Sequence, residues 1–224
     1  MPKLIAVIHY LDDATSIKNA EIVEAAGYDG VCLIHMSGHD RLIEDAAVEI
    51  KKRFPHLVVI TNRLAMSALE MIERDAALGL DGSWCDNPGV SSGCVSPLAH
   101  SIEAALIELR KTKPDFLFFG SVAFKTQPHE PDPATAAVKA KSLGWIATTS
   151  GPATGIAPDE DKLDRMKTAI ASFDLAVASG ITPENAEVLC QHVDWVLVST
   201  GISASFYEFD PAKAAALRAS APRD

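Results

Sequence analysis

Two stretches near the C-terminus each end a buried apolar run with small and hydroxyl residues, which are residue types that bind anions. The first stretch runs from Leu175 to Asn185 and the second from Trp195 to Ser203. Glycine lets the backbone approach a ligand, and the N–H groups of a helix start that follows favour a negative charge. The sequence therefore predicts a phosphate site at the ends of these two runs. Its expected members are Ser179, Gly180, Ile181, Thr182, Thr200, Gly201 and Ser203.

Lys125 is the sharpest candidate for a catalytic cation. It stands shortly after the apolar run Phe116–Gly120 and opens a polar loop that continues to Pro133. A lysine ammonium neutralises a phosphate or carboxylate, and a desolvated lysine has a lowered pKa and forms Schiff bases with carbonyl compounds. The alternative is a solvated lysine at the head of the loop. We expect charge neutralisation rather than a Schiff base, because no residue near Lys125 in sequence would desolvate it.

Asp86 and His9 are candidates for proton transfer, and each also stands at the end of an apolar run. A carboxylate or an imidazole at such a position could act as a general acid or base. Asp86 precedes Asn-Pro-Gly, so a turn-forming role is the alternative. His9, His35 and His39 have the donor chemistry of a divalent metal site for zinc, manganese or iron. Their spacing matches no compact ligand motif, so no cofactor is predicted and a divalent metal stays an alternative.

The ends of further apolar runs carry polar residues that would contact the rest of a substrate. The loop from Ser150 to Gly155 contains two glycines and two hydroxyl side chains that would bind a second polar group of the ligand. A tight turn is the alternative for this loop. Cys85 and Cys94 indicate packed thiols rather than a metal site. The expected substrate contacts are His35, Asn62, Ser150, Gly151 and Thr154.

Apolar runs and helical patterns alternate along the whole chain with one spacing. The expected strands are Leu4–His9, Gly30–Met36, Leu57–Thr61, Gly82–Asp86, Phe116–Gly120, Trp145–Thr149, Leu175–Ser179 and Trp195–Thr200. The expected helices are Ser16–Ala26, Ile43–Phe54, Ala65–Leu78, Pro97–Lys111, Pro133–Ser142, Asp159–Ala171, Pro183–Cys190 and Asp210–Ala219. The strands are continuously apolar, as is typical of parallel strands that are buried on both faces.

Eight such units predict a single (β/α)8 barrel, an α/β fold, over residues 1–224. An open doubly wound sheet is the alternative, but it requires a glycine-rich first turn, and the segment from His9 to Asp13 contains no glycine. In a barrel, the carboxyl ends of all strands lie on one face, and the loops after strands 7 and 8 often bind phosphate. The fold would therefore bring the candidate residues together.

The composition excludes several classes of protein. The 224 residues are 48% hydrophobic and carry a formal net charge of −10, which suits one globular domain. No basic run could follow a nucleic acid or an anionic membrane, and no apolar run approaches the roughly 18 residues of a membrane span. The start of the chain lacks a signal-peptide pattern, and the four cysteines form no disulfide framework. We therefore expect a cytoplasmic protein with a small phosphorylated ligand, and we further expect a homo-oligomer.

The residues at the ends of several predicted strands resemble those of the BtpA/SgcQ family of (β/α)8 barrel proteins. The stretch from Ala178 to Asn185 is the most similar, and the stretch from Thr149 to Asp159 resembles the family's Ser-Gly-x-x-Thr-Gly loop. Three shorter stretches are also similar: Ala6 to Tyr10, Ile60 to Leu64 and Phe209 to Lys213. The resemblance spans nearly the whole chain and implies a barrel with an anion site. One branch of the family is linked to photosystem I biogenesis, and another lies near enzymes of sugar metabolism.

Departures from the family pattern leave the reaction open. The family's fifth strand usually ends Asp-Val-x-Val-Lys-His, whereas the segment from Ser121 to Thr126 keeps the lysine but neither the aspartate nor the histidine. The second strand usually ends Glu-Asn, and His35 followed by Met36 stands here. Phosphoribosylanthranilate isomerase has similar glycine-rich ends of strands 7 and 8. It places a cysteine where this chain has His9, which argues against that activity.

Two functions fit these observations. The first is an enzyme that acts on a small phosphorylated metabolite, a sugar phosphate or phosphoribosyl compound, by isomerase, lyase or transferase chemistry. Lys125 would stabilise developing negative charge, and Asp86 or His9 would move the proton. The second is a non-catalytic barrel that binds a phosphorylated ligand and acts in the assembly or biogenesis of other proteins. The missing acid on the fifth strand favours this second function.

Overall fold

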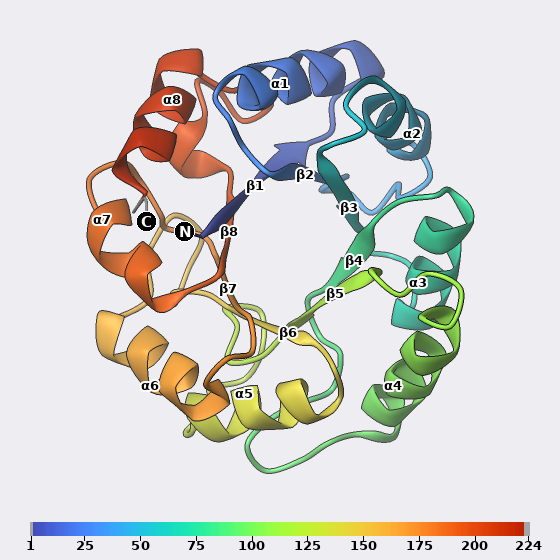
Figure 1. Ribbon diagram of the computed structural model, residues 1–224, viewed down its shortest axis with the longest axis vertical. Coiled ribbons are helices and arrows are strands. Elements are labelled where there is room, and N and C mark those ends of the chain that lie inside the picture. The colour runs from blue at the N-terminus through green and yellow to red at the C-terminus, as the bar shows by residue number, and fades with distance from the viewer. Residues whose placement is uncertain (1, 222–224) are drawn as a thin grey trace.

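The computed structural model describes residues 2–221 and folds them into a closed barrel of eight parallel strands (Figure 1). The strands are β1 (Lys3–His9), β2 (Gly30–Ile34), β3 (Val58–Asn62), β4 (Gly82–Cys85), β5 (Leu117–Ser121), β6 (Ile146–Thr149), β7 (Leu175–Ala178) and β8 (Trp195–Val198). The helices are α1 (Asp13–Ala25), α2 (Glu44–Arg53), α3 (Ala68–Ala77), α4 (Pro97–Leu109), α5 (Pro133–Ser142), α6 (Glu160–Ile170), α7 (Ala186–Leu189) and α8 (Pro211–Ser220). The predicted (β/α)8 barrel is confirmed.

Alternate residues of each strand point into the barrel and out toward the helices. In β1, Ile5 and Val7 belong to the inner cluster of buried residues, whereas Ile8 packs in the outer layer. Large rings fill the inside: Phe119 and Trp195 meet edge to face, with 5.3 Å between ring centroids. Because the interior is packed, the residues that can meet a ligand are those just beyond the inward-facing positions, at the carboxyl ends of the strands.

The helices form a ring outside the barrel, and each strand is followed by its helix (Figure 1). Their apolar faces cover the strands: Ala46, Ala47 and Ile50 of α2 are all fully buried. Within residues 2–221, none of the helices combines the length and the apolarity that crossing a membrane requires.

Side-chain caps fix where several strand-to-helix loops end. Ser67 and Glu70 form a reciprocal capping box at the start of α3. Ser96 accepts the Ala99 N–H at the start of α4, where Pro97 occupies the first helical position. Because helices start on the face where parallel strands end, these caps also shape the rim of the candidate site.

The helix after β7 is shorter than predicted. The sequence predicts a helix over Pro183–Cys190, but α7 covers only four residues and passes into a 3₁₀ turn, Cys190–His192. The side chain of Asn185 accepts the Thr182 N–H at 2.9 Å and donates to the Gly180 carbonyl at 2.8 Å. Local bonds of this kind compete with helix formation. The anion-binding argument from a helix dipole is therefore wrong at this strand end, because so short a helix sums few peptide dipoles.

Candidate functional site

Asp86 and Asn62 lie side by side at the ends of β4 and β3. Asn62 Nδ2 donates to Asp86 Oδ1 at 2.9 Å. Ile60 and Trp84, two residues earlier on the same strands, belong to the inner cluster, so both polar side chains sit on the inward-facing side of their strands. Burial raises the pKa of Asp86, while the bond from Asn62 and the charge of Lys125 lower it. A carboxyl group with a raised pKa at the barrel mouth suits general acid–base chemistry.

Lys125 reaches the same mouth from the loop after β5. Its backbone N–H donates to Ser150 Oγ at 2.9 Å, and its Nζ lies 5.4 Å from the centroid of the Phe124 ring. Burial lowers the pKa of the half-buried ammonium, and the charge of Asp86 raises it. Within the described part of the chain, no carboxylate forms a salt bridge with this ammonium. Residues near Lys125 in sequence do not desolvate its ammonium. The tertiary fold does so, by burying half of the side chain.

His9 ends β1 and is held by the loop after β8. Its ring stacks on Phe206, with 4.4 Å between ring centroids, and its Nδ1 lies 3.1 Å from the Phe206 carbonyl oxygen. Because a carbonyl oxygen only accepts, Nδ1 carries the hydrogen, and Nε2 of the neutral ring is left as an acceptor. Burial lowers the pKa of His9, the Phe206 bond raises it, and the charge of Lys125 lowers it further. The neutral ring therefore keeps Nε2 as a nitrogen that can accept a proton.

The structure thus brings the three predicted catalytic residues into one electrostatic group, because the charge of Lys125 acts on both His9 and Asp86. A residue that was not among the predicted site residues holds this group. Gln127 Nε2 donates to the carbonyls of Asp86 at 2.9 Å and Ser121 at 2.8 Å, which ties the end of β4 to the end of β5. A glutamine in a polar loop carries no sequence signal for such a role.

The ends of β7 and β8 offer unbonded backbone N–H groups. Among residues 2–221, the N–H groups of Gly180, Ile181, Thr200 and Gly201 donate no hydrogen bond within the protein. Gly180 and Ile181 are themselves buried, and buried N–H groups normally have a partner. The two strand ends also touch: a Cβ added at Gly201 would lie 2.1 Å from the Ile181 carbonyl oxygen. These four N–H groups therefore lie in adjacent loops that can accept an anion.

The glycines of these loops have a different use from the predicted one. A Cβ added at Gly180 would lie 2.2 Å from the Ala157 nitrogen, and one at Gly151 would lie 2.0 Å from the Ile156 carbonyl oxygen. The space left by the missing side chains is thus filled by the backbone of the β6–α6 loop and not kept for a ligand. The expectation that glycine serves close ligand approach is corrected here: it serves the close packing of loops.

Several hydroxyl groups of the predicted site are also occupied within the protein. Ser179 Oγ accepts the Gly155 N–H at 2.9 Å. The Ser179 backbone has a φ of +87°, which is unusual for a residue other than glycine. Ser203 Oγ donates to the Ser199 carbonyl at 2.8 Å. These side chains fix the shape of the loops, and the N–H groups are left as the candidate donors to a ligand. Two further predicted residues are exposed: Thr154 and Thr200.

The predicted histidine group is divided between two local roles. His35 Nδ1 accepts the N–H groups of Ser37 and His39, each at 3.3 Å, and so shapes the loop after β2. His9 is instead bonded to the β8 loop. Among the described residues, no three His, Cys, Asp or Glu side chains gather closely enough to hold a metal ion. Burial raises the pKa of Cys85 to about 11, which keeps this thiol protonated and unreactive.

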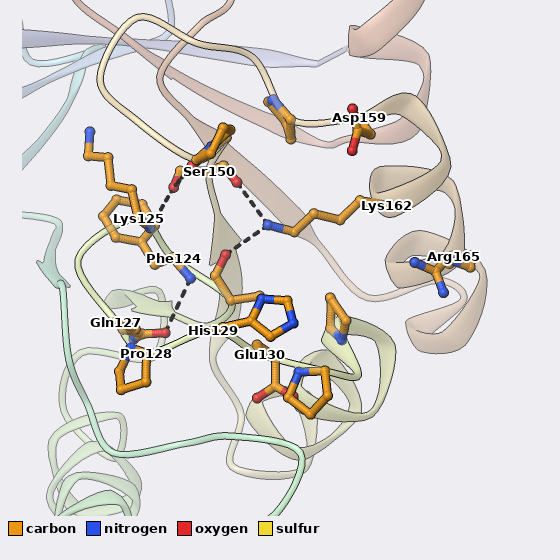
Figure 2. A pocket seen from close by; sticks show the side chains of 16 residues that line it. Phe124, Lys125, Gln127, Pro128, His129, Glu130, Ser150, Asp159, Lys162 and Arg165 are labelled. Atoms are coloured by element: carbon orange, nitrogen blue, oxygen red, sulfur yellow. Dashed lines mark hydrogen bonds between the residues drawn. The ribbon is translucent and has the colours of Figure 1, made fainter.

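A cavity of about 570 Å³ opens between the ends of β5 and β6 (Figure 2). Lys162, from the first turn of α6, lines it and donates to the carbonyls of Ala123 and Ser150, each at 2.8 Å. Burial lowers the pKa of Lys162 to about 8. Lys162 was not among the predicted site residues. The available signal is a lysine in the first turn of a helix, where the macrodipole disfavours a cation, so another partner is expected.

No family model matches the chain, and no curated protein matches it. The resemblance of the strand ends to the BtpA/SgcQ family therefore stays a prediction.

Solved structures share the fold over nearly the whole chain. Phosphoribosyl anthranilate isomerase from Thermus thermophilus is 16% identical with a TM-score of 0.70, and the match covers 98% of each chain. 3-Hexulose-6-phosphate synthase is 17% identical with a TM-score of 0.70, over 98% of this chain and 100% of the other. (S)-3-O-geranylgeranylglyceryl phosphate synthase from Thermoplasma acidophilum, in complex with sn-glycerol-1-phosphate, is 20% identical with a TM-score of 0.66, over 98% and 92%. At these identities the likeness shows the fold alone.

Proposed function

We propose that this chain is an enzyme that acts on a small phosphorylated metabolite, with the phosphate bound at the ends of β7 and β8. One observation carries the proposal: four backbone N–H groups of these two touching loops have no acceptor among the described residues. Phosphate oxygens accept several N–H bonds at once, and each bond is strengthened by the negative charge. The candidate reacting groups His9, Asp86 and Lys125 stand at the same end of the barrel.

The similar solved structures support the general kind of ligand. 3-Hexulose-6-phosphate synthase is named for a sugar phosphate, and (S)-3-O-geranylgeranylglyceryl phosphate synthase was solved with sn-glycerol-1-phosphate. Phosphoribosyl anthranilate isomerase is named for a phosphoribosyl compound. A sugar phosphate or a phosphoribosyl compound is therefore the substrate class that we propose. Membership of the BtpA/SgcQ family is part of the proposal and rests on the strand-end motifs.

The arrangement suits proton transfer at a carbon next to a carbonyl group. Nε2 of neutral His9 would remove the proton, because Nδ1–H is engaged by the Phe206 carbonyl. Lys125 would neutralise the charge that develops on the carbonyl oxygen. Asp86, whose pKa is raised by burial, would return a proton to the product. Return of the proton to the neighbouring carbon gives an isomerase. If Asp86 instead protonates a leaving group on the adjacent carbon as its bond breaks, the reaction is that of a lyase.

A non-catalytic barrel that binds a phosphorylated ligand is the second candidate. The observation that favours it is the end of β5, where the resembled family has an acid and this chain has Ser121. Ser121 is fully buried, and its Oγ accepts the Trp84 Nε1–H at 3.0 Å. This strand therefore contributes no acid to the mouth.

Turnover of a panel of sugar phosphates, measured beside calorimetric binding of the same compounds, tests the proposal. We expect one compound to be turned over, and we expect Asp86→Asn to reduce its turnover by about 10²-fold or more. Phosphate affinity should change little, because the Asp86 carboxylate is bonded to Asn62 at the end of β3 and not to the β7 and β8 loops. Binding without turnover of any compound would favour the non-catalytic barrel. Absence of binding to every compound and to inorganic phosphate would overturn the phosphate site.

A further inference from the structure

Lys162 is a cation that makes its contacts with backbone carbonyls. Its Nζ donates to Ala123 O and Ser150 O, each at 2.8 Å, at the ends of β5 and β6 (Figure 2). No salt bridge joins it to a carboxylate in residues 2–221, although the charge of Asp159 acts on it from the start of α6. Placing a half-buried ammonium away from a bonded carboxylate is costly, and the two carbonyl bonds offset part of that cost.

The two carbonyls belong to residues that are linked to the Lys125 backbone. Ala123 precedes Lys125 by two residues, and Ser150 holds the Lys125 N–H through its Oγ at 2.9 Å. Lys162 therefore bonds both segments that determine where the backbone of Lys125 runs. Thr149 Oγ1 adds a second bond to the Ala123 carbonyl at 3.1 Å.

The turn that Lys162 holds is a strained one. Ala123 has a φ of +49°, a left-handed conformation that non-glycine residues rarely adopt. This turn places Phe124 in the inner cluster, 3% exposed, and leads directly to Lys125. Strained turns persist when their surroundings hold them. The charge-assisted bond from Lys162 is one of the contacts that hold this turn.

We propose that Lys162 is a positioning residue that clamps the ends of β5 and β6 and so keeps the Lys125 ammonium half-buried in the barrel mouth. The inference deepens the proposed function, because it concerns the cation of the same mouth. It predicts that loss of the clamp lets Lys125 move into water, where desolvation no longer lowers its pKa.

Competitive acetylation with acetic anhydride over a series of pH values, read by peptide mass spectrometry, measures the titration of Lys125 without any substrate. In Lys162→Met we expect the Lys125 midpoint to move up, toward that of the solvated lysines in the same digest. Lys162→Arg, which keeps a cation and several donors, should keep the lower midpoint. Lys139→Met is the matched control, because Lys139 Nζ also donates to a carbonyl, that of Ser92 at 2.6 Å, away from Lys125. Its Lys125 midpoint should equal that of the unchanged chain.

An unchanged Lys125 midpoint in folded Lys162→Met would overturn the proposal, and so would an equal shift in Lys139→Met. If Lys162→Met does not fold, Lys162→Gln keeps a polar side chain but is too short and uncharged to hold both carbonyls, and it should produce the same upward shift. No shift in folded Lys162→Gln would then contradict the clamp. Because the labelling needs no ligand, its failure is distinguishable from failure of the proposed phosphate site.

Discussion

The molecule contains two groups of buried charge that differ in how completely they are paired. In the outer layer, Arg63 donates to Asp75 Oδ1 at 3.0 and 2.8 Å and to Glu44 Oε1 at 3.0 Å. Asp75 Oδ2 also accepts the hydroxyls of Thr61 at 2.7 Å and Ser83 at 2.6 Å. At the mouth, by contrast, Lys125 has no bonded carboxylate in the described part of the chain, and the side chain of Asp86 has one bonded partner, Asn62.

The difference is the one we expect between a structural group of charges and the reactive group proposed at the mouth. In the Arg63 group, the charged atoms meet partners from α2, α3, β3 and β4, so the group ties four elements together. Burial shifts pKa values in both groups: it raises that of Asp75 in the Arg63 group, and at the mouth it raises that of Asp86 and lowers those of His9 and Lys125. Only at the mouth do these shifts occur without full pairing, and groups perturbed in this way concentrate where chemistry is done. The completeness of pairing, and not burial alone, distinguishes the two groups.

The largest expected effect is the loss of Arg63. Arg63→Ala leaves Asp75 and Glu44 without their buried cation and should lower the free energy of unfolding by about 3–5 kcal/mol. Lys125→Met should lower it little or even raise it, because the variant removes a desolvated charge that has no bonded carboxylate. Urea denaturation of both variants checks the contrast. Equal losses of stability would break the comparison.

The next largest effect is on turnover. Once a substrate is known, Asp86→Asn should reduce turnover by about 10²-fold or more, because the amide cannot exchange the proton, while changing the free energy of unfolding by less than about 1 kcal/mol. Asp75→Asn should show the reverse pattern, with lower stability and near-normal turnover of the folded fraction. Steady-state kinetics and urea denaturation on the same samples decide the matter. Normal turnover in Asp86→Asn would remove this carboxyl from the mechanism.

Two glycine substitutions sharpen the distinction between backbone conformation and loop packing. Gly79 and Gly180 both have a φ of +77°, but a Cβ at Gly79 would meet nothing within 4 Å, whereas one at Gly180 would meet the Ala157 backbone. Gly79→Ala should cost about 1–2 kcal/mol for the left-handed conformation alone. Gly180→Ala should cost about 1–3 kcal/mol more, because the β6–α6 loop must move. Thermal or urea unfolding measures both, and equal costs would show that the loops yield freely.

The smallest expected effect is a change in the pH dependence of stability. The pKa of Asp86 is raised in the folded state, so the folded state binds more protons than the unfolded state between the ordinary aspartate pKa and the raised one. This contribution to stability is present at low pH and is lost as the pH rises through the raised pKa. In Asp86→Asn, which has no carboxyl group to titrate, this decrease in the free energy of unfolding with rising pH should be absent. The check is the free energy of unfolding of both chains across the acid range, and identical slopes would contradict the assigned shift.

The fold and the strand-end residues could be predicted because both follow from local patterns. Continuous apolar runs identify buried parallel strands, and the residue that ends each run, such as His9, Asn62 or Asp86, falls at the carboxyl end of its strand. The period of two along a strand then directs these side chains inward, which the positions of Ile60 and Trp84 confirm.

The remaining features depend on partners that are far apart in sequence. Lys162 donates a hydrogen bond to Ala123, which is 39 residues away, and no local sequence pattern predicts that contact. The space beside Gly180 is taken by the loop at Ala157, so the use of that glycine is decided by tertiary packing. The shortened α7 has a local cause in the hydrogen bonds of Asn185. In the sequence, however, the segment Pro183–Asn185 is equally typical of the start of a longer helix.

The most direct test of the phosphate site is a titration of the ¹⁵N-labelled chain with inorganic phosphate, followed by two-dimensional NMR of the backbone amides. We expect the amide signals of Gly180, Ile181, Thr200 and Gly201 to shift first and most, because these N–H groups have no acceptor among the described residues. Sodium sulfate should shift the same signals, and sodium chloride at equal ionic strength should not. Shifts confined to other residues, or none at millimolar phosphate, would contradict the assignment of the ends of β7 and β8 as the phosphate site.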